Sequence, residues 1–347
     1  TGLKYLPGVF AEVEEIIELA TAAARYGGIY TSHLREEGIG LIEGVGEAIR
    51  IGHQANIPVV LTHHKVVGEP MWGASQRTLA MVDSARALGV DVMLDHYPYT
   101  ASCTDLSILI PSWCLAGGQE EFVNRTQNPV LRDSILRGIK WNLLHDRGGG
   151  DLDRVQLAST PWDSSLAGKT LKYWAHREGL EPTVDHGARL ILEAQLQGGG
   201  KGIYHAMDED DLRRIMRHPL TMIGSDGFLT SPDEAWAHPR SYGTYPRILG
   251  HYVREEKVID LPTAIQKMTS MPADRLGLNK RGRLQVGNYA DIVIFDPAAV
   301  KAQATFMDPH QYSSGIEYVL VNGTITIEGG EFTKERAGRV LRKTELN

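Results

Sequence analysis

Three side chains with metal-binding or acid–base chemistry stand at the ends of predicted strands. His33 ends the run Ile29-Tyr30-Thr31-Ser32, His63 follows Val60-Leu61-Thr62, and Asp226 follows Ile223-Gly224-Ser225. In parallel α/β folds the carboxyl ends of the strands face the reactive site, so these side chains should converge. Neutral imidazoles suit zinc, and a nearby aspartate can bind the metal or take a proton from its water. One such histidine is more often a core residue, but two histidines with an aspartate favour a metal site.

Cations and phenols accompany these residues. Lys65 lies two residues after His63 and so shares its face of the chain, Arg240 lies in the loop after the strand of Asp226, and Tyr97 follows another predicted strand. Such groups suit a substrate that carries a carboxylate beside the scissile bond. The alternative is that Lys65 and Arg240 form surface ion pairs with Glu36, Glu37 or Asp233.

The elements that must position these residues alternate along the chain. Apolar spacing predicts helices over 12–26, 40–55, 71–88 and 209–217, and strands over 29–33, 57–62, 90–95, 155–159 and 221–225. This order indicates βαβ units and a parallel sheet. The weaker pattern over 107–150 predicts a lid-like excursion. From Gly282, the hairpin signals Gly287-Asn288 and Asn322-Gly323 predict a small β domain, which gives domains over 1–281 and 282–347.

Composition excludes several classes of protein. The 347 residues carry 36 Lys and Arg against 43 Asp and Glu, a net charge of −7, with no basic stripe that would indicate a nucleic acid partner. The apolar runs are far shorter than the roughly 20 residues that a membrane-spanning helix needs. The two cysteines, Cys103 and Cys114, form no C-x-x-C pair and suggest a reducing compartment, so we expect a cytoplasmic protein.

The ordered motifs resemble those of the N-acyl-D-amino-acid deacylases (D-aminoacylases), a family of the amidohydrolase superfamily. The match runs over nearly the whole chain. The motifs are Gly2-Leu3-x-Tyr5-x-Pro7-Gly8, Thr31-Ser32-His33-Leu34-Arg35-x-Glu37-Gly38, His63-His64-Lys65, Asp95-x-Tyr97-Pro98-Tyr99, Ile223-Gly224-Ser225-Asp226-Gly227, His238-Pro239-Arg240-x-Tyr242-Gly243-Thr244, Pro272-Ala273, Gly282-Arg283-Leu284, Gly287-x-x-Ala290-Asp291-Ile292-Val293 and Val321-Asn322-Gly323.

This resemblance implies an α/β fold, the C-terminal half of a metal-dependent (β/α)8 TIM-type barrel with part of a small β-sandwich. By position, His33 and His63 would be zinc ligands on the fifth and sixth strands, and Asp226 on the eighth would be the general base. The substrate carboxylate would be held by Lys65, Tyr97 and Arg240, and Cys103 stands where the family has a serine. A thiol is a poorer hydrogen-bond donor than a hydroxyl.

The family's N-terminal β-sandwich segment, His-x-His strand and zinc-binding cysteine have no counterpart in this sequence. The resemblance implies that another chain or segment supplies them, and that strand five has an open edge. We also expect Thr1 to lie in the loop after strand four. A hydroxyl there suggests self-cleavage of a precursor at Thr1 and a heterodimer of the two pieces. Separately encoded subunits, proteolytic nicking and a numbering that starts within a longer chain are the alternatives.

The function that this reading favours is zinc-dependent hydrolysis of N-acyl-D-amino acids to a carboxylate and a D-amino acid. A cyclic-amide or dipeptide hydrolase, similar to dihydroorotase, hydantoinase or isoaspartyl dipeptidase, is the first alternative. Lys65 together with Arg240 favours an open α-carboxylate over a ring imide. A non-catalytic barrel scaffold is the second alternative, and the joint presence of His33, His63 and Asp226 counts against it.

Overall fold

The computed structural model describes residues 1–231 and 236–341, and the chain divides into two compact units. The first unit comprises Thr1–Leu94, Tyr99–Ile215 and Leu229–His238. The second comprises Asp95–Pro98, Met216–Phe228 and Pro239–Asn347. Each unit is described by itself below, and the predicted boundary after residue 281 stays a prediction.

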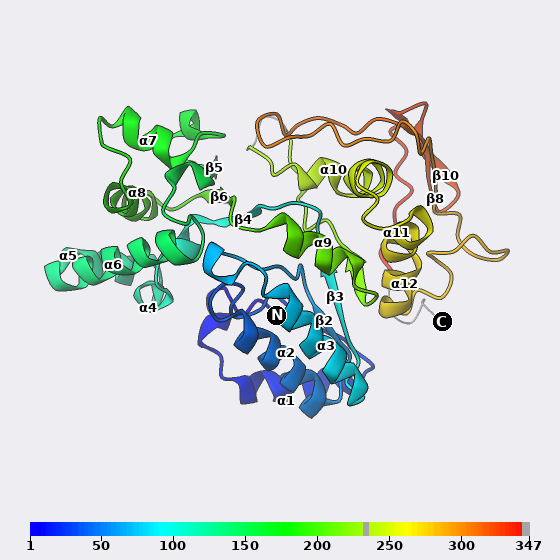
Figure 1. Cartoon of the computed structure of the whole chain (residues 1–347), viewed down its shortest axis with the longest axis horizontal. Coiled ribbons are helices and arrows are strands. Elements are labelled where there is room, and N and C mark those ends of the chain that lie inside the picture. Colours follow the sequence, from blue (N-terminus) through cyan, green and yellow to red (C-terminus); the bar gives the residue numbers. More distant parts are fainter. Residues whose placement is uncertain (232–235, 342–347) are drawn as a thin grey trace. The chain divides into compact units, whose positions relative to one another are not determined.

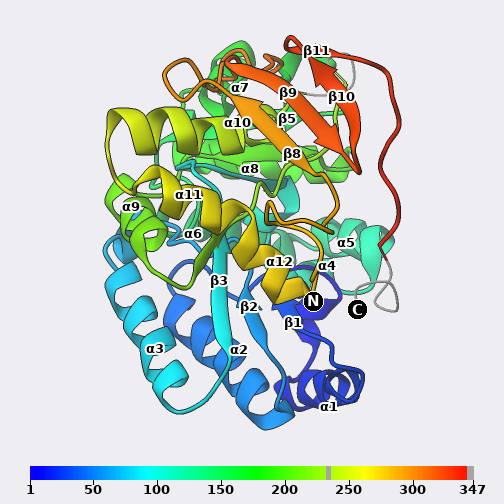
Figure 2. The same cartoon turned by 90° about the vertical axis from the view of Figure 1, so that its right-hand side faces the viewer.

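A parallel sheet in the first unit carries the predicted βαβ alternation. Its strands β1 (Tyr30–Ser32), β2 (Val59–Leu61) and β3 (Val92–His96) pair in parallel in that order, and β3 continues into the second unit. Figures 1 and 2 show three helices packed beside these strands, α1 (Val13–Ala24), α2 (Leu41–Ala55) and α3 (Ser75–Ala87). All three residues of β2 are buried, as expected for a parallel strand covered on both faces. The predicted helices and strands of this region are confirmed.

Helix α2 shows how the sequence sets these elements. Its buried side chains recur with helical spacing at Leu41, Val45, Ala48, Ile51 and Ala55. The helix ends at Asn56, which adopts the left-handed conformation (φ 48°) and donates its amide to the carbonyls of the last turn. The chain then turns directly into β2, which leads to His63.

The edge of β1 is not open at the end that carries His33. Gly2 forms a parallel bridge with His33, the amide of His33 donates to the carbonyl of Thr1 (3.1 Å), and the amide of Leu3 donates to the carbonyl of His33 (3.1 Å). Residues 1–3 extend beside this end of β1, because exposed edge groups of a strand gain hydrogen bonds from a parallel neighbour. As expected, β1 is the edge strand of its sheet, and Thr1 lies outside any strand.

A helical layer with its own core makes up the rest of the first unit. Its sheet is antiparallel, with β4 (Ser102–Asp105) and β5 (Val155–Ser159) both paired to β6 (Lys201–Tyr204), so the parallel placement expected for 155–159 is wrong. A short strand alone does not reveal which partner it pairs with. The helices are α4 (Ser112–Leu115), α5 (Gly118–Gln127), α6 (Pro129–His145), α7 (Leu171–Arg177) and α8 (Val184–Leu196). Short 3-10 turns are η1 (Gly8–Phe10), η2 (Glu69–Met71), η3 (Leu106–Leu109), η4 (Leu152–Arg154) and η5 (Ser164–Leu166).

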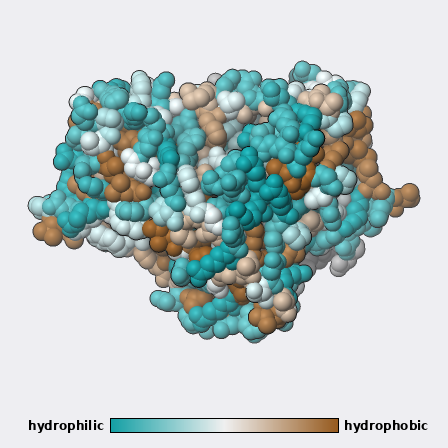
Figure 3. Space-filling model, in the orientation of Figure 1, coloured by the Kyte–Doolittle hydropathy of each residue, from teal (hydrophilic) through white to brown (hydrophobic). Residues whose placement is uncertain are grey.

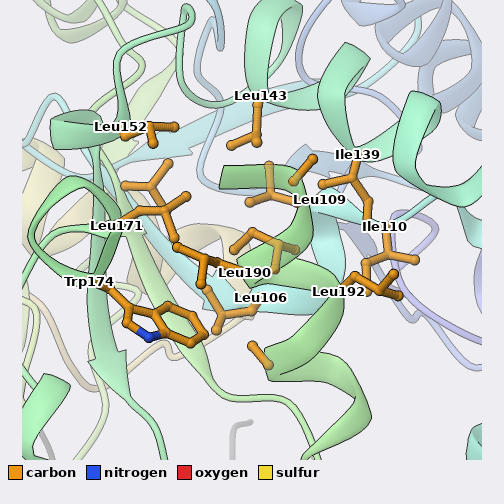
Figure 4. Close-up of a cluster of buried hydrophobic side chains, with 14 of the residues drawn as sticks. Leu106, Leu109, Ile110, Ile139, Leu143, Leu152, Leu171, Trp174, Leu190 and Leu192 are labelled. Carbon is orange, nitrogen blue, oxygen red and sulfur yellow. The ribbon is translucent and has the colours of Figure 1, made fainter. Parts of the chain in front are cut away.

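Figure 4 shows the core of this layer, where leucines and isoleucines from α6, α8 and η3 meet Trp174 of α7. Within 107–150, the side chains of Ile135, Ile139 and Leu143 on α6 are fully buried at i, i+4 spacing. The segment expected to be an excursion is therefore a set of packed helices. Its role as a lid stays a prediction.

The second unit begins with the end of β3 and contains β7 (Thr221–Ile223). The amide of Gly224 donates to the carbonyl of His96, which fixes the turn that leads to Asp226. The fully buried Lys267 donates to the carbonyls of His218 (2.5 Å) and Thr221 (2.8 Å). The helices are α10 (Arg240–Arg247), the π-helix η6 (Ile248–Glu255), α11 (Leu261–Met268) and α12 (Ser270–Leu276), and α9 (Glu209–Arg217) runs from the first unit into this one.

An antiparallel sheet closes the second unit (Figure 2). Its order is β11-β10-β9-β8, with β8 (Ile292–Phe295), β9 (Ile316–Val321), β10 (Thr324–Glu328) and β11 (Glu331–Phe332). Asn322 and Gly323 both have positive φ (51° and 84°), as a tight two-residue hairpin turn between β9 and β10 requires. The hairpin predicted at Asn322-Gly323 is confirmed. The one predicted at Gly287-Asn288 is wrong, because these residues form a turn that joins no paired strands.

The face of the protein in Figure 3 is mostly hydrophilic, with apolar residues in small patches. Among the helices of the described residues, none combines the length and the apolar character that crossing a bilayer requires.

Candidate functional site

Two of the predicted site residues meet in the first unit. The ring centroids of His33 and His63 lie 4.2 Å apart, and His63 Nε2 faces His33 Nδ1. His33 directly follows β1 and His63 follows β2, so neighbouring parallel strands place the two rings together. His63 is buried and has a left-handed backbone (φ 41°). Such a conformation is uncommon outside glycine and is concentrated at functional sites.

Behind His63 lies a buried charged cluster that the sequence interpretation did not recognise as one. Glu37 Oε1 lies 3.2 Å from His63 Nδ1 and 2.6 Å from Lys65 Nζ, and Lys65 Nζ lies 2.5 Å from His63 Nδ1. The other oxygen, Glu37 Oε2, lies 3.4 Å from Arg147 Nη2. Arg147 Nε in turn lies 3.3 Å from Asp146 Oδ2. Lys65 therefore pairs with Glu37, one of the alternatives above, although inside the protein and not on its surface.

The cluster sets the protonation of its members. Burial alone would raise the pKa of Glu37, but the charge of Lys65, the interaction with His63 and the charge of Arg147 hold this pKa well below the ordinary value. Burial lowers the pKa of Arg147, and Asp146 and Glu37 more than reverse that effect. The two carboxylates thus face two cations, and the charges balance. Glu37 stands in the motif of His33, four residues later, which is the one sequence signal that marked it.

A second group of predicted residues meets in the second unit. Arg240 Nη1 lies 2.8 Å from Asp226 Oδ2, and the Arg240 guanidinium lies 4.6 Å from the ring centroid of Tyr97. Arg240 and Tyr97 are buried, whereas the Asp226 side chain is 29% exposed. The expected partner Asp233 lies outside the described residues. Arg240 therefore pairs with Asp226, the residue that the sequence predicts to be the general base.

The turn at Asp226 is tightly constrained. Asp226 has a left-handed backbone (φ 49°), the second such residue in the predicted site. At the next position, a Cβ on Gly227 would lie 2.9 Å from the Cα of Ser241, so only glycine allows this approach to α10. Beside the turn, burial raises the pKa of Tyr245 despite its hydrogen bond with Ser225. Sequence reasoning missed Tyr245, and no spacing signal marked it.

The remaining predicted residues take other positions. Cys103 lies within β4 opposite Ile203 of β6, in the first unit, and Cys114 is a buried thiol that donates to the carbonyl of Pro111. Burial raises the pKa of Cys114 to about 11, which makes it an unreactive core residue. The hydroxyl of Thr1 lies 2.7 Å from Ser32 Oγ and 3.0 Å from the hydroxyl of Tyr30, beside β1.

A cavity of about 710 Å³ in the first unit adjoins the His33 side of this arrangement. Tyr5 lines it, and the ring of Tyr5 meets that of His33 edge-on at a centroid distance of 5.1 Å. Its polar lining includes the ion pair of Lys4 and Glu36 (2.9 Å). Most of the remaining wall is apolar and includes Leu6, Val9, Ile39, Ile108, Ile110, Pro111, Trp113, Leu115 and Trp141.

The imidazole pair fits part of a metal site. His33 Nδ1 and His63 Nε2 face the same point, and nitrogen lone pairs are ligands that zinc accepts. In the described ranges, 1–231 and 236–341, there is no group of three or more His, Cys, Asp or Glu side chains that could hold a metal ion. Two nitrogen ligands are thus what these residues offer.

Comparison with known proteins identifies the class. Residues 161–327 match the model of the amidohydrolase family. The α/β content and the structural neighbours agree with the TIM-barrel type of fold found in this superfamily. A dihydropyrimidinase from Brevibacillus agri, 12% identical with a TM-score of 0.51, shares the fold alone.

Closer relatives narrow this assignment to a group within the superfamily. The D-aminoacylase of Alcaligenes xylosoxydans xylosoxydans is 39% identical over 99% of this chain, and the N-acyl-D-glutamate deacylase of the same organism is also 39% identical. A solved D-aminoacylase structure has a TM-score of 0.78 at 36% identity, over 98% of this chain. The chain spans 61% of the first of these relatives, 60% of the second and 61% of the solved chain. The resemblance to N-acyl-D-amino-acid deacylases is confirmed.

Proposed function

We propose that this protein hydrolyses the amide bond of N-acyl-D-amino acids with the help of zinc, giving a carboxylate and a D-amino acid. The observation that carries the proposal is the pair of facing imidazoles on neighbouring parallel strands, in a chain homologous to D-aminoacylase and N-acyl-D-glutamate deacylase. A solved N-acyl-D-glutamate deacylase from Bordetella bronchiseptica, 35% identical, is described as a complex with zinc and a phosphonate mimic of the tetrahedral intermediate.

In this proposal His33 and His63 hold the metal. Zinc, when bound, polarises the acyl carbonyl and lowers the pKa of a water. Asp226 takes a proton from the attacking water and returns it to the leaving amine. Its partly exposed side chain and its place after a buried strand support this assignment.

Arg240 is the main anchor that we propose for the substrate carboxylate. It is buried against the ring of Tyr97, which limits its conformations, and a guanidinium matches a carboxylate with two parallel hydrogen bonds. Lys65 shares its charge with Glu37, so its contribution to substrate binding is smaller. Cys103 remains a weaker proposed contact.

Ring-opening amidohydrolases are a weaker alternative. A dihydroorotase-like protein is 28% identical over only 48% of this chain, and the dihydropyrimidinase shares only the fold. A scaffold without activity is weaker still, since it would not require the facing imidazoles.

We further propose that the parallel strands are strands five to eight of a (β/α)8 barrel in the cytoplasm, with β8–β11 as part of a sandwich. A separate chain or segment would supply the remaining strands and the His-x-His ligands. This proposal is supported by the facing imidazoles of His33 and His63, which offer two nitrogens of the four ligands that a zinc site usually has.

Three measurements test the function. N-acetyl-D-amino acids, their L-enantiomers, their carboxamides and a hydantoin are offered to the purified protein, and zinc content is measured by mass spectrometry. We expect D-selective hydrolysis of linear substrates and its loss in His63→Ala. Stoichiometric zinc with hydrolysis of hydantoin alone would favour the ring-opening alternative, and absence of zinc with absence of hydrolysis would favour the scaffold.

A further inference from the structure

Glu37 occupies a position that the proposed chemistry does not yet use. A single oxygen, Oε1, lies within hydrogen-bond reach of both His63 Nδ1 (3.2 Å) and Lys65 Nζ (2.6 Å). Glu37 follows His33 by four residues and precedes α2, so the segment that leaves one imidazole reaches behind the other.

The other oxygen of Glu37 is held from a distant part of the chain. Arg147 Nη2 lies 3.4 Å from Glu37 Oε2, and Arg147 Nη1 donates to Ser102 Oγ (3.1 Å). Arg147 is 2% exposed and follows α6, so its position is set by the helical core. Arg147 therefore restricts the orientation of the Glu37 carboxylate.

A histidine that binds a metal through Nε2 carries its proton on Nδ1. Lys65 Nζ lies 2.5 Å from His63 Nδ1, but an ammonium only donates, so of these two neighbours Glu37 Oε1 is the one that can accept a proton carried on Nδ1. An acceptor at Nδ1 fixes both the tautomer and the direction of the ring, which raises metal affinity. We propose that Glu37 is the positioning residue of this site. Its carboxylate orients His63 toward the metal and holds Lys65 beside it, and Arg147 keeps the carboxylate in place. This inference rests on the proposed function, because it requires that His63 binds zinc.

The first test compares Glu37→Gln with Glu36→Gln. The control residue is adjacent and also pairs with a lysine, Lys4, at 2.9 Å, but its side chain is 47% exposed and lines the cavity. Zinc affinity is measured by competition with a chelator. We expect Glu37→Gln to bind zinc about 10- to 100-fold more weakly. The zinc affinity of Glu36→Gln should stay within about threefold of wild type. That change is smaller than the roughly tenfold loss that is the least expected for Glu37→Gln. Affinity of Glu37→Gln equal to that of Glu36→Gln would overturn the inference, whereas absence of zinc from the wild type would overturn the proposed function.

The second test separates positioning from charge balance. The double variant Glu37→Gln with Lys65→Met removes one charge of each sign, so it should unfold at a temperature closer to wild type than Glu37→Gln does. We expect its zinc affinity to remain as low as that of Glu37→Gln. Full recovery of zinc affinity in the double variant would show that Glu37 serves charge balance alone.

A third measurement needs no variant that must fold. In the zinc-loaded wild type, nitrogen-15 and proton spectra of labelled histidine should show the His63 ring with a protonated Nδ1. That proton should exchange slowly with water because a carboxylate holds it. The same signal should persist in Glu36→Gln. Coordination of His63 through Nδ1, or an Nδ1 proton that exchanges as fast as that of an exposed histidine, would contradict the inference.

Discussion

The two groups of candidate site residues differ in how deeply their charged side chains are buried and in how they are paired. In the first unit, Glu37, Lys65 and Arg147 are each no more than 9% exposed, and every charge in the cluster has at least one opposite charge within 3.4 Å. In the second unit, the buried Arg240 faces Asp226, whose side chain is 29% exposed. Buried charges are retained only where partners compensate the loss of water.

This difference indicates that the two groups have different roles, one in holding ligands and the other in exchanging protons. The cluster of the first unit has no carboxylate that could leave its partners without a large cost, so it is suited to holding ligands in place. Asp226 keeps access to water and is suited to exchanging protons. His63 and Asp226 nevertheless share a left-handed backbone after a buried strand, which aims both side chains away from the regular strand direction. The predictions below test whether the buried cluster holds the ligands and Asp226 exchanges protons.

The largest effect should come from Asp226→Asn, because an amide cannot accept the proton of water. We expect kcat to fall by roughly 10² to 10⁴ while zinc content stays at the wild-type level. Asp274→Asn, at an exposed ion pair with Arg283 in the same unit, is the control. Activity of Asp226→Asn within a few-fold of this control would show that Asp226 is not the base.

A smaller and selective effect is expected at Arg240. For Arg240→Met, KM for N-acyl-amino acids should rise on the order of 10- to 100-fold, since a charge-assisted hydrogen bond contributes about 1.5–3 kcal/mol. KM for the corresponding carboxamides should change little. Lys65→Met should show the weaker selectivity of the two, because Lys65 is paired with Glu37. Equal losses on acids and carboxamides in both variants would mean that neither residue anchors the carboxylate.

The pH dependence of stability should single out the buried cluster. The pKa of Glu37 in the folded protein lies well below its ordinary value of 4.5. Its stabilisation is therefore complete above pH 4.5 and is lost as the pH falls toward the folded-state pKa. Urea unfolding is measured between pH 6 and pH 3, a range of about three units that includes the ordinary pKa of a carboxyl group. The free energy of unfolding should fall less steeply with decreasing pH in Glu37→Gln than in wild type. Parallel curves for the two proteins would place the acid sensitivity elsewhere.

The last effect, at Lys267, should appear in stability and leave the substrate preference unchanged, because this residue ties α11 to the strand that leads to Asp226. Burial lowers its pKa from 10.5 to about 8, so the unfolded chain binds the proton more tightly between these values. Stability of the wild type should therefore rise relative to Lys267→Met as the pH increases from about 8 to 10.5. Removing the ammonium also leaves two carbonyls without their donor, at about 1–3 kcal/mol each. The melting temperatures of wild type and Lys267→Met are compared at about pH 7, 8 and 10, which lie within about one unit of the two pKa values of Lys267. This comparison measures both effects.

Local pattern was sufficient for much of the fold. The alternating segments up to β3 and the Asn322-Gly323 hairpin appear where the sequence predicts them, because helix periodicity and turn chemistry act over a few residues. The partners of 155–159 did not follow from pattern, because pairing depends on which strand the fold brings alongside. The helices within 107–150 carried too weak a periodicity to be predicted, and they form only together with α7 and α8 in one shared core.

Residue type and spacing were enough to predict that His33 and His63 leave neighbouring strands, because both are local properties of the chain. The sequence also marked Asp226 and Arg240 as chemically significant. The partners of the charged side chains depend on the tertiary structure, because an ion pair needs groups that the fold brings together and removes from water. Glu37 and Arg147 are 110 residues apart in sequence and meet behind His63 in the folded chain, where Arg147 follows α6 of the helical core.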